Sequence, residues 1–222
     1  LEKLAHPAEQ AALKINGISK SQSTSAFYGE QNIHLRATNG FSGGYKKSHS
    51  GVFCSVISGN DMEMERDSFG DARTHRSDLI SPEEIGKTAG ERAVKKLNSR
   101  KAKTGNFPVL FDERISNSLI GHLLSAINGR AIVQGASWAN DLFGKPIFPK
   151  GTSLVEDPQR VRSYGSRPFD GEGLPTLKRT IIKDGRLNEW TLDLATARQL
   201  DATSTANASR GVSSPPTPSI SN

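Results

Sequence analysis

Residues 81–97 constrain the fold most, because they carry a complete set of helix signals. Ser81 is a good N-cap, Pro82 occupies the first helical position, and Glu84 stands three residues after the cap. Lysines close the segment. Its apolar positions recur at four-residue steps: Ile85, Ala89, Ala93 and Leu97. We therefore expect an amphipathic helix over 81–97 with one apolar face.

Alternating polar and apolar residues dominate the chain before this helix. Ile33 and Leu35 alternate with polar neighbours, and Asn39-Gly40 is a strong turn signal. Residues 43–60 and 62–76 continue the strand pattern. We expect an antiparallel meander there, preceded by a short helix over 7–15 with Pro7 in its first turn.

The chain after the helix begins with a basic linker, residues 98–106, which we take as a domain boundary. Residues 107–112 predict a buried strand that leads into a helix starting near Asn117. His122 lies outside the expected inward arc of that helix. The arc comprises Leu119, Ile120, Leu123, Leu124 and Ile127.

Further elements follow towards the end of the chain. Residues 152–157 predict a strand, Asp184-Gly185 predicts a hairpin, and residues 194–200 predict a short helix. Together the elements predict an α+β fold in which helices interrupt antiparallel strand pairs. We expect one domain over 1–104 and a truncated second domain over 105–222. The start at Leu1 and the Ser/Thr/Pro-rich end lead us to expect a fragment.

Composition and charge restrict the partners. The net charge of +6 would suit an anionic partner, but the basic cluster 92–103 has no interleaved aromatic side chain for base stacking. We therefore do not expect nucleic acid to be the partner. The single cysteine, Cys54, excludes an internal disulfide framework and fits a buried, inert thiol. No stretch approaches the ~18 apolar residues of a membrane span, so we expect no membrane and a cytoplasmic setting.

Several segments match one family pattern when they are taken in order. They are residues 38–50, 54–67, 82–98, 121–131 and 165–173, extended by 192–200 and 208–211. Together they resemble the TldD/PmbA family of metallopeptidase-related proteins, also called the modulator of DNA gyrase family, and within it the PmbA/TldE branch. The resemblance implies a PmbA/TldD-like central domain followed by part of the C-terminal domain.

The resemblance also bears on the zinc motif. The catalytic TldD branch carries a His-Glu-x-x-x-His motif, understood to bind zinc and supply the base. Aligned on His122, this chain has Asn117 and Ser118 in place of the first histidine and the glutamate. Asparagine is a poor zinc ligand, and serine cannot accept a proton as a carboxylate would. The resemblance implies a vestigial motif, no catalytic residue and no zinc in this chain, with zinc in a TldD-type partner. His122 remains a relic, a partner contact or a hydrogen-bonded boundary histidine.

Residues of two loops are further candidates for the substrate chamber or a partner contact: Arg167, Asp170, Glu172 and Trp138. In an extended segment Asp170 and Glu172 would project to the same side and could share acid–base work. The flanking glycines favour instead a tight turn whose acids cap backbone donors or pair with Arg167. Trp138 lies in a loop, where exposure would indicate a contact surface.

The function implied by the resemblance is that of a PmbA/TldE-type, non-catalytic subunit of a cytoplasmic metallopeptidase complex. A TldD-type subunit would be its partner, and unfolded or short peptides would be the substrate. Two alternatives stay open. The chain could be a metallopeptidase in its own right with ligands outside this fragment, or a DNA- or gyrase-associated binding module.

Overall fold

The computed structural model describes residues 1–222, apart from the side chain of Met62, and divides into two compact units. The first unit comprises Leu1–Asn32 and Lys46–Asn106. The second comprises Ile33–Tyr45 and Phe107–Asn222. The tip of the first hairpin, Ile33–Tyr45, therefore belongs to the second unit. The predicted domains, divided only at residue 104, did not anticipate this.

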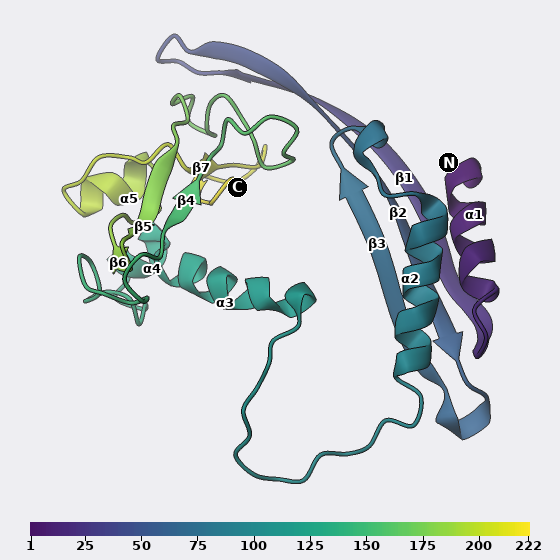
Figure 1. Ribbon diagram of the computed structural model, residues 1–222. Coiled ribbons are helices and arrows are strands. Elements are labelled where there is room, and N and C mark those ends of the chain that lie inside the picture. Colours follow the sequence, from purple (N-terminus) through teal and green to yellow (C-terminus); the bar gives the residue numbers. More distant parts are fainter. The chain divides into compact units, whose positions relative to one another are not determined.

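The first unit contains a three-stranded antiparallel sheet covered by helices on one face (Figure 1). The strand order is β1-β2-β3, as the meander predicts. Two short 3-10 turns, Asp61–Glu63 and Arg76–Asp78, flank β3. The elements are α1 (Glu2–Leu13), β1 (Ile18–Arg36), β2 (Ser42–Ser58), β3 (Glu65–Arg73) and α2 (Pro82–Lys95).

Helix α2 forms as its sequence signals predict. The Ser81 side chain accepts a hydrogen bond from the Glu84 N–H at 3.2 Å, and Pro82 opens the helix. Burial of the apolar face against β2 and α1 creates the first core. Its fully buried members include Val52, Cys54, Val56, Ile85, Ala89 and Ala93. Cys54 is thus buried as expected, and desolvation raises the pKa of its thiol, while a hydrogen bond from Thr24 opposes the rise.

Helix α1 begins earlier than its sequence suggests, so Pro7 lies inside the helix rather than in the first turn. Proline lacks the N–H of an interior helical position and is usually excluded there. Tertiary packing compensates for this local cost. Ala8 and Ala12 are fully buried against α2, and a Cβ on Gly86 would approach the Ala8 carbonyl oxygen to 1.8 Å. The missing side chain of Gly86 therefore permits the close approach of the two helices.

The hairpin between β1 and β2 turns where Asn39-Gly40 predicts. Gly40 has a φ of 93°, which favours glycine, and the Ala37 N–H donates to the Phe41 carbonyl at 3.0 Å. Phe41 and Tyr45 pack on the ring of Phe169 in edge-to-face geometry, with centroid separations of 4.9 and 5.2 Å. These contacts attach the hairpin tip to the loop that carries Asp170.

The second unit combines helices with a three-stranded antiparallel sheet, in the order β4-β5-β6, and a two-stranded one, β7-β8 (Figure 1). The hairpin at Asp184-Gly185 forms as predicted, with positive φ angles of 47° and 78°. The strand expected over 152–157 and the short helix expected over 194–200 are also present. The elements are α3 (Glu113–Ala126), α4 (Gly129–Val133), β4 (Leu154–Glu156), β5 (Arg179–Lys183), β6 (Arg186–Leu187), α5 (Leu194–Gln199), β7 (Ala208–Ser209) and β8 (Thr217–Pro218).

The structure corrects two predictions near the start of this unit. Residues 107–112 form no strand, and Leu110 is 97% exposed. Helix α3 begins at Glu113, where Asp112 caps it, rather than near Asn117. Only part of the apolar face expected to point inward is buried. Leu123 and Ile127 are buried, whereas Leu119 is exposed. A run of apolar residues indicates that a segment is buried, but it does not specify which other element of the fold buries it.

No helix among the described residues is both long enough and apolar enough to cross a membrane.

Candidate functional site

The residues predicted to form a vestigial motif lie on a regular, exposed stretch of helix α3. Asn117, Ser118 and His122 are all exposed, and the Ser118 hydroxyl donates to the Ile115 carbonyl at 2.6 Å. In such a helix, side chains five residues apart diverge by ~140°, so Asn117 and His122 lie on different sides. An amide, a hydroxyl and one imidazole placed in this way do not form a zinc ligand set.

The rest of the described chain brings no metal-ligand cluster together. Apart from the undescribed Met62 side chain, no three His, Cys, Asp or Glu residues gather in an arrangement that could hold a metal ion. The residues at the three motif positions of α3 therefore do not fit the group that the resemblance implies for the catalytic branch. Placement of zinc in a partner remains a prediction.

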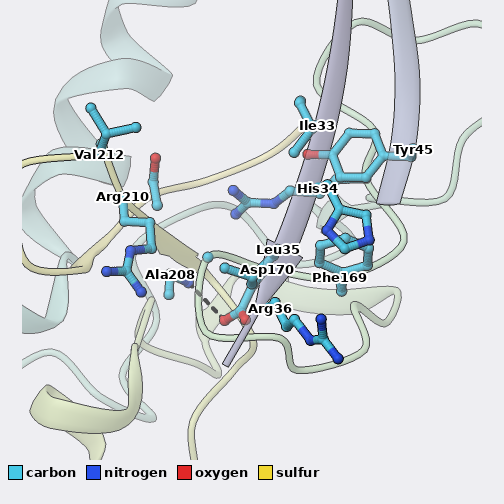
Figure 2. Close-up of a pocket in the computed structure, with 14 residues that line it drawn as sticks. Ile33, His34, Leu35, Arg36, Tyr45, Phe169, Asp170, Ala208, Arg210 and Val212 are labelled. Atoms are coloured by element: carbon cyan, nitrogen blue, oxygen red, sulfur yellow. Dashed lines mark hydrogen bonds between the residues drawn. The ribbon is translucent and has the colours of Figure 1, made fainter. Parts of the chain in front are cut away.

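Two of the predicted site residues, Arg167 and Asp170, line a pocket of the second unit that sequence reasoning did not identify. Figure 2 shows this pocket with Asp170 labelled. The pocket has a volume of about 490 Å³. Its walls are the end of β1, the start of β2, the loop 167–171 and the segment 208–212. The side chains that matter most for its chemistry are His34, Arg36, Tyr45, Arg167, Phe169, Asp170 and Arg210.

Asp170 holds the wall of this pocket together. Its side chain is buried, and its carboxylate accepts hydrogen bonds from the N–H groups of Glu172 and Leu174, both at 2.9 Å, and of Ala208 at 3.0 Å. The adjacent Gly171 N–H donates to the Ala208 carbonyl at 2.7 Å. Three backbone donors on one carboxylate fix the loop against β7.

Arg167 precedes Asp170 by three residues in the sequence, but the two side chains form no ion pair among the described residues. One guanidinium N–H donates to the Ser219 carbonyl at 3.1 Å, whereas the buried Nε has no hydrogen-bond partner among the described residues. Burial raises the pKa of the neighbouring Tyr45 hydroxyl, and the positive charge of Arg167 opposes that rise. Arg167 is therefore a positive charge in the pocket wall with unused donor capacity.

Glu172 points to a different place from Asp170. Residues 171–173 form a turn rather than an extended segment, and the Glu172 carboxylate accepts from the Leu194 N–H at 2.9 Å, at the start of α5. Burial raises the pKa of the Glu172 carboxyl, and the charges of Asp170 and Asp193 add to the rise, while the Leu194 N–H and Arg198 oppose it. Among the described residues neither acid forms an ion pair with Arg167. A shared acid–base role has no support in this geometry.

Trp138 lies in a loop outside this pocket, with 64% of its surface exposed. An exposed tryptophan in a loop is what we expect at a contact surface, and that role of Trp138 remains a prediction. Trp190 instead packs partly buried against the second core and lies 5.3 Å from Phe143, measured between ring centroids.

The residues that sequence reasoning missed are His34, Arg36, Tyr45 and Arg210. His34 and Arg36 occupy the polar positions of an alternating strand, which normally indicates a solvated face. Arg210 follows a two-residue strand near the end of the chain. Nothing local to any of these positions indicates that the fold brings them together.

The fold has solved counterparts. A crystal structure from Bacteroides thetaiotaomicron, described as a candidate modulator of DNA gyrase, superimposes with a TM-score of 0.84 at 27% identity. The match covers 91% of this chain and 46% of that one. A structure from Thermotoga maritima with the same description has a TM-score of 0.86 at 23% identity and covers 97% of this chain and 49% of that one.

Family models assign both parts of the chain. The model of the PmbA/TldA metallopeptidase central domain matches residues 2–97, and the model of the C-terminal domain matches residues 104–222. The fold and these matches define a metallopeptidase-like protein built from a central and a C-terminal domain. The chain belongs to the PmbA/TldD metallopeptidase family.

Curated relatives place the match in a longer protein. The metalloprotease PmbA of Escherichia coli O157:H7 is 33% identical over 206 residues, which are 92% of this chain and 46% of that protein. A PmbA homologue from Buchnera aphidicola (subsp. Acyrthosiphon pisum) is 37% identical over 164 residues, 73% of this chain and 36% of that protein. The chain thus spans less than half the length of these relatives.

Proposed function

We propose that this chain is part of a PmbA/TldE-type, non-catalytic subunit that works with a zinc-bearing TldD-type subunit in the cytoplasm on unfolded or short peptides. The observation that carries the proposal is the composition of helix α3. The positions of a His-Glu-x-x-x-His motif hold Asn117, Ser118 and His122, which supply one imidazole and no carboxylate. A hydrolytic zinc site needs about three protein ligands and a general base.

Assignment to the PmbA side of the family is supported by the extent of the alignments. The PmbA relatives align over 92% and 73% of this chain, whereas a TldD homologue from Buchnera aphidicola aligns over 56% at 29% identity. The fold is also shared with TldE from Thermococcus kodakarensis, at a TM-score of 0.76 and 20% identity.

The test is to purify the full-length protein alone and together with a TldD-type subunit, and to measure bound zinc and peptide hydrolysis in each sample. We expect zinc and hydrolysis only where the TldD-type subunit is present. Stoichiometric zinc in this protein alone, accompanied by peptide hydrolysis, would support the alternative of a complete metallopeptidase and overturn the proposal.

A second candidate is a DNA-associated role, favoured by the net charge of +6 and by the description of the two structural relatives as candidate modulators of DNA gyrase. Binding driven by phosphate contacts weakens steeply with salt. Duplex DNA binding by the full-length protein that persists at low salt and falls as salt rises would support this role. Absence of binding at low salt would remove it.

A further inference from the structure

The pocket of the second unit is lined by several positively charged side chains. Arg36, Arg167 and Arg210 line it, together with His34. Figure 2 shows His34, Arg36 and Arg210 among the lining side chains. The pocket's volume of about 490 Å³ falls within the range of small-ligand sites. The described lining contains no carboxylate other than that of Asp170, and both oxygens of that group already accept backbone N–H donors.

The donors of these arginines are largely unused. Within the described part of the chain, Arg36 and Arg210 make no side-chain hydrogen bond or ion pair, and the guanidinium group of Arg167 donates only from Nη2, to the Ser219 carbonyl. Each guanidinium group carries five N–H donors, so most of the donors of these three arginines are available to a ligand acceptor. Guanidinium groups bind the oxygens of carboxylates and phosphates in a two-bond geometry, so the partner of these arginines is an oxyanion, and a carboxylate is the oxyanion that a peptide supplies.

The same pocket offers the free edge of a strand. β1 is an outer strand of its sheet. The Ala37 N–H donates across the hairpin to Phe41, so antiparallel alternation turns the backbone groups of His34 and Arg36 towards the outer edge. An extended peptide can add to such an edge through main-chain hydrogen bonds. Tyr45 and Phe169 pack edge-to-face at 78°, rather than forming a flat platform for nucleic-acid bases.

We infer that this pocket binds an extended peptide by its carboxylate, which is held among Arg36, Arg167 and Arg210. The carboxylate belongs either to the peptide's C-terminus or to an aspartate or glutamate side chain. This inference rests on the proposed function, because it assigns a substrate feature to the same peptide-handling subunit. The subunit would then select peptides by their negative charge, in addition to enclosing them in the substrate chamber.

The experiment measures binding of fluorescent peptides to the full-length protein paired with its TldD-type subunit. Three peptides share one neutral sequence: the first ends in a free carboxylate, the second ends in an amide, and the third ends in an amide but carries one internal glutamate. We expect the amide without glutamate to bind at least about tenfold more weakly than the better of the other two. Comparison of the first and third peptides identifies which carboxylate the pocket takes.

Paired variants connect this preference to the pocket. Arg36→Gln with Arg210→Gln, at exposed positions, should reduce the preference for a carboxylate by about tenfold. Arg130→Gln with Arg160→Gln removes the same charge from exposed positions outside the pocket and should keep the preference.

The possible outcomes separate this inference from the proposed function. Equal binding of all three peptides, or equal effects of the two double variants, would overturn the carboxylate site while peptide hydrolysis by the pair continued. Failure of every peptide to bind would overturn the proposed function as well. Single-stranded DNA that competes for the pocket, combined with no discrimination among the peptides, would show that the arginines serve nucleic acid instead.

Discussion

Arg179 on β5 and Glu156 on β4 form a buried ion pair in the second unit. The Glu156 carboxylate also accepts from the Asn207 side chain at 2.9 Å and from the Ser221 N–H at 2.6 Å. Arg179 donates further to the Trp190 carbonyl, at 3.0 Å. The pair thus joins the β4-β5-β6 sheet to two residues near the end of the chain, Asn207 and Ser221. Asn207 directly precedes β7, which forms part of the pocket wall.

Removal of one member of this pair should destabilise the protein strongly. Arg179→Met leaves the Glu156 charge buried without its counter-ion, and such losses cost about 3–5 kcal/mol. We expect that decrease in the free energy of unfolding of the full-length protein, measured by urea titration. A double-mutant cycle with Glu156→Gln should give a coupling energy above about 2 kcal/mol.

The exposed Lys87 and Glu91 pair on α2, with a separation of 4.0 Å, provides the matched control. Its coupling energy should be about 0.5 kcal/mol or less, because water screens both charges. Similar coupling in the two cycles would contradict the assigned role of the buried pair.

Helix packing in the first unit should depend on the absence of a side chain at Gly86. Gly86→Ala would place a methyl group against the Ala8 carbonyl, which forces α1 and α2 apart, and we expect a loss of about 1–3 kcal/mol in stability. Gly121→Ala in α3 is the control, because nothing lies within 4 Å of its Cβ position. That variant should gain about 0.5–1 kcal/mol from helix propensity. Thermal unfolding of both variants tests the contrast, and a stable Gly86→Ala protein would contradict the packing.

The carboxyl of Glu172 should make stability depend on pH. Its folded-state pKa lies above the ordinary value of 4.5, chiefly because of burial, so the folded protein binds this proton more tightly than the unfolded chain. The resulting stabilisation is present below the ordinary pKa and is lost as pH rises through the folded pKa. Glu172→Gln should therefore gain stability relative to the parent as the pH rises above the ordinary carboxyl pKa. Urea titrations below and above that pKa check this, and a difference that does not vary with pH would count against it.

Substitutions on α3 test whether the motif is vestigial. His122 is exposed and belongs to no metal-binding cluster of three His, Cys, Asp or Glu residues among those described, so His122→Ala should leave peptide hydrolysis by the reconstituted pair nearly unchanged. Asn117→His with Ser118→Glu should still bind no zinc in the protein alone, because a third ligand is lacking and the five-residue spacing diverges on a regular helix. Zinc analysis and a peptidase assay provide the measurements. Turnover by the second variant would falsify the vestigial assignment.

Local signals explain what the sequence predicts well. The cap at Ser81 and the turn at Asp184-Gly185 are encoded in a few adjacent residues, so α2 and the β5–β6 hairpin appear where expected. The turn reading of Asp170 and Glu172 also depended on neighbouring glycines. Helix α1 shows the limit of such signals, because packing on α2 retains Pro7 inside a helix that local preference would end.

The features that were missed depend on contacts between distant parts of the chain. Residues 107–112 are apolar enough for a strand, but no strand partner accompanies them in the described chain. The pocket brings together Arg36, Arg167 and Arg210 from three separated segments. No spacing in the sequence relates such residues, because their proximity follows from how the hairpin tip packs on the 167–171 loop.

The assignment of the hairpin tip to the second unit has a consequence for limited proteolysis. The chain passes between the units at three points: after Asn32, after Tyr45 and after Asn106. A protease that cuts only within 98–106 would therefore leave Phe41 and Tyr45 seated on Phe169. The two fragments should migrate together on a native gel and separate in detergent, and a clone that starts at residue 105 would lack part of the unit it is meant to express.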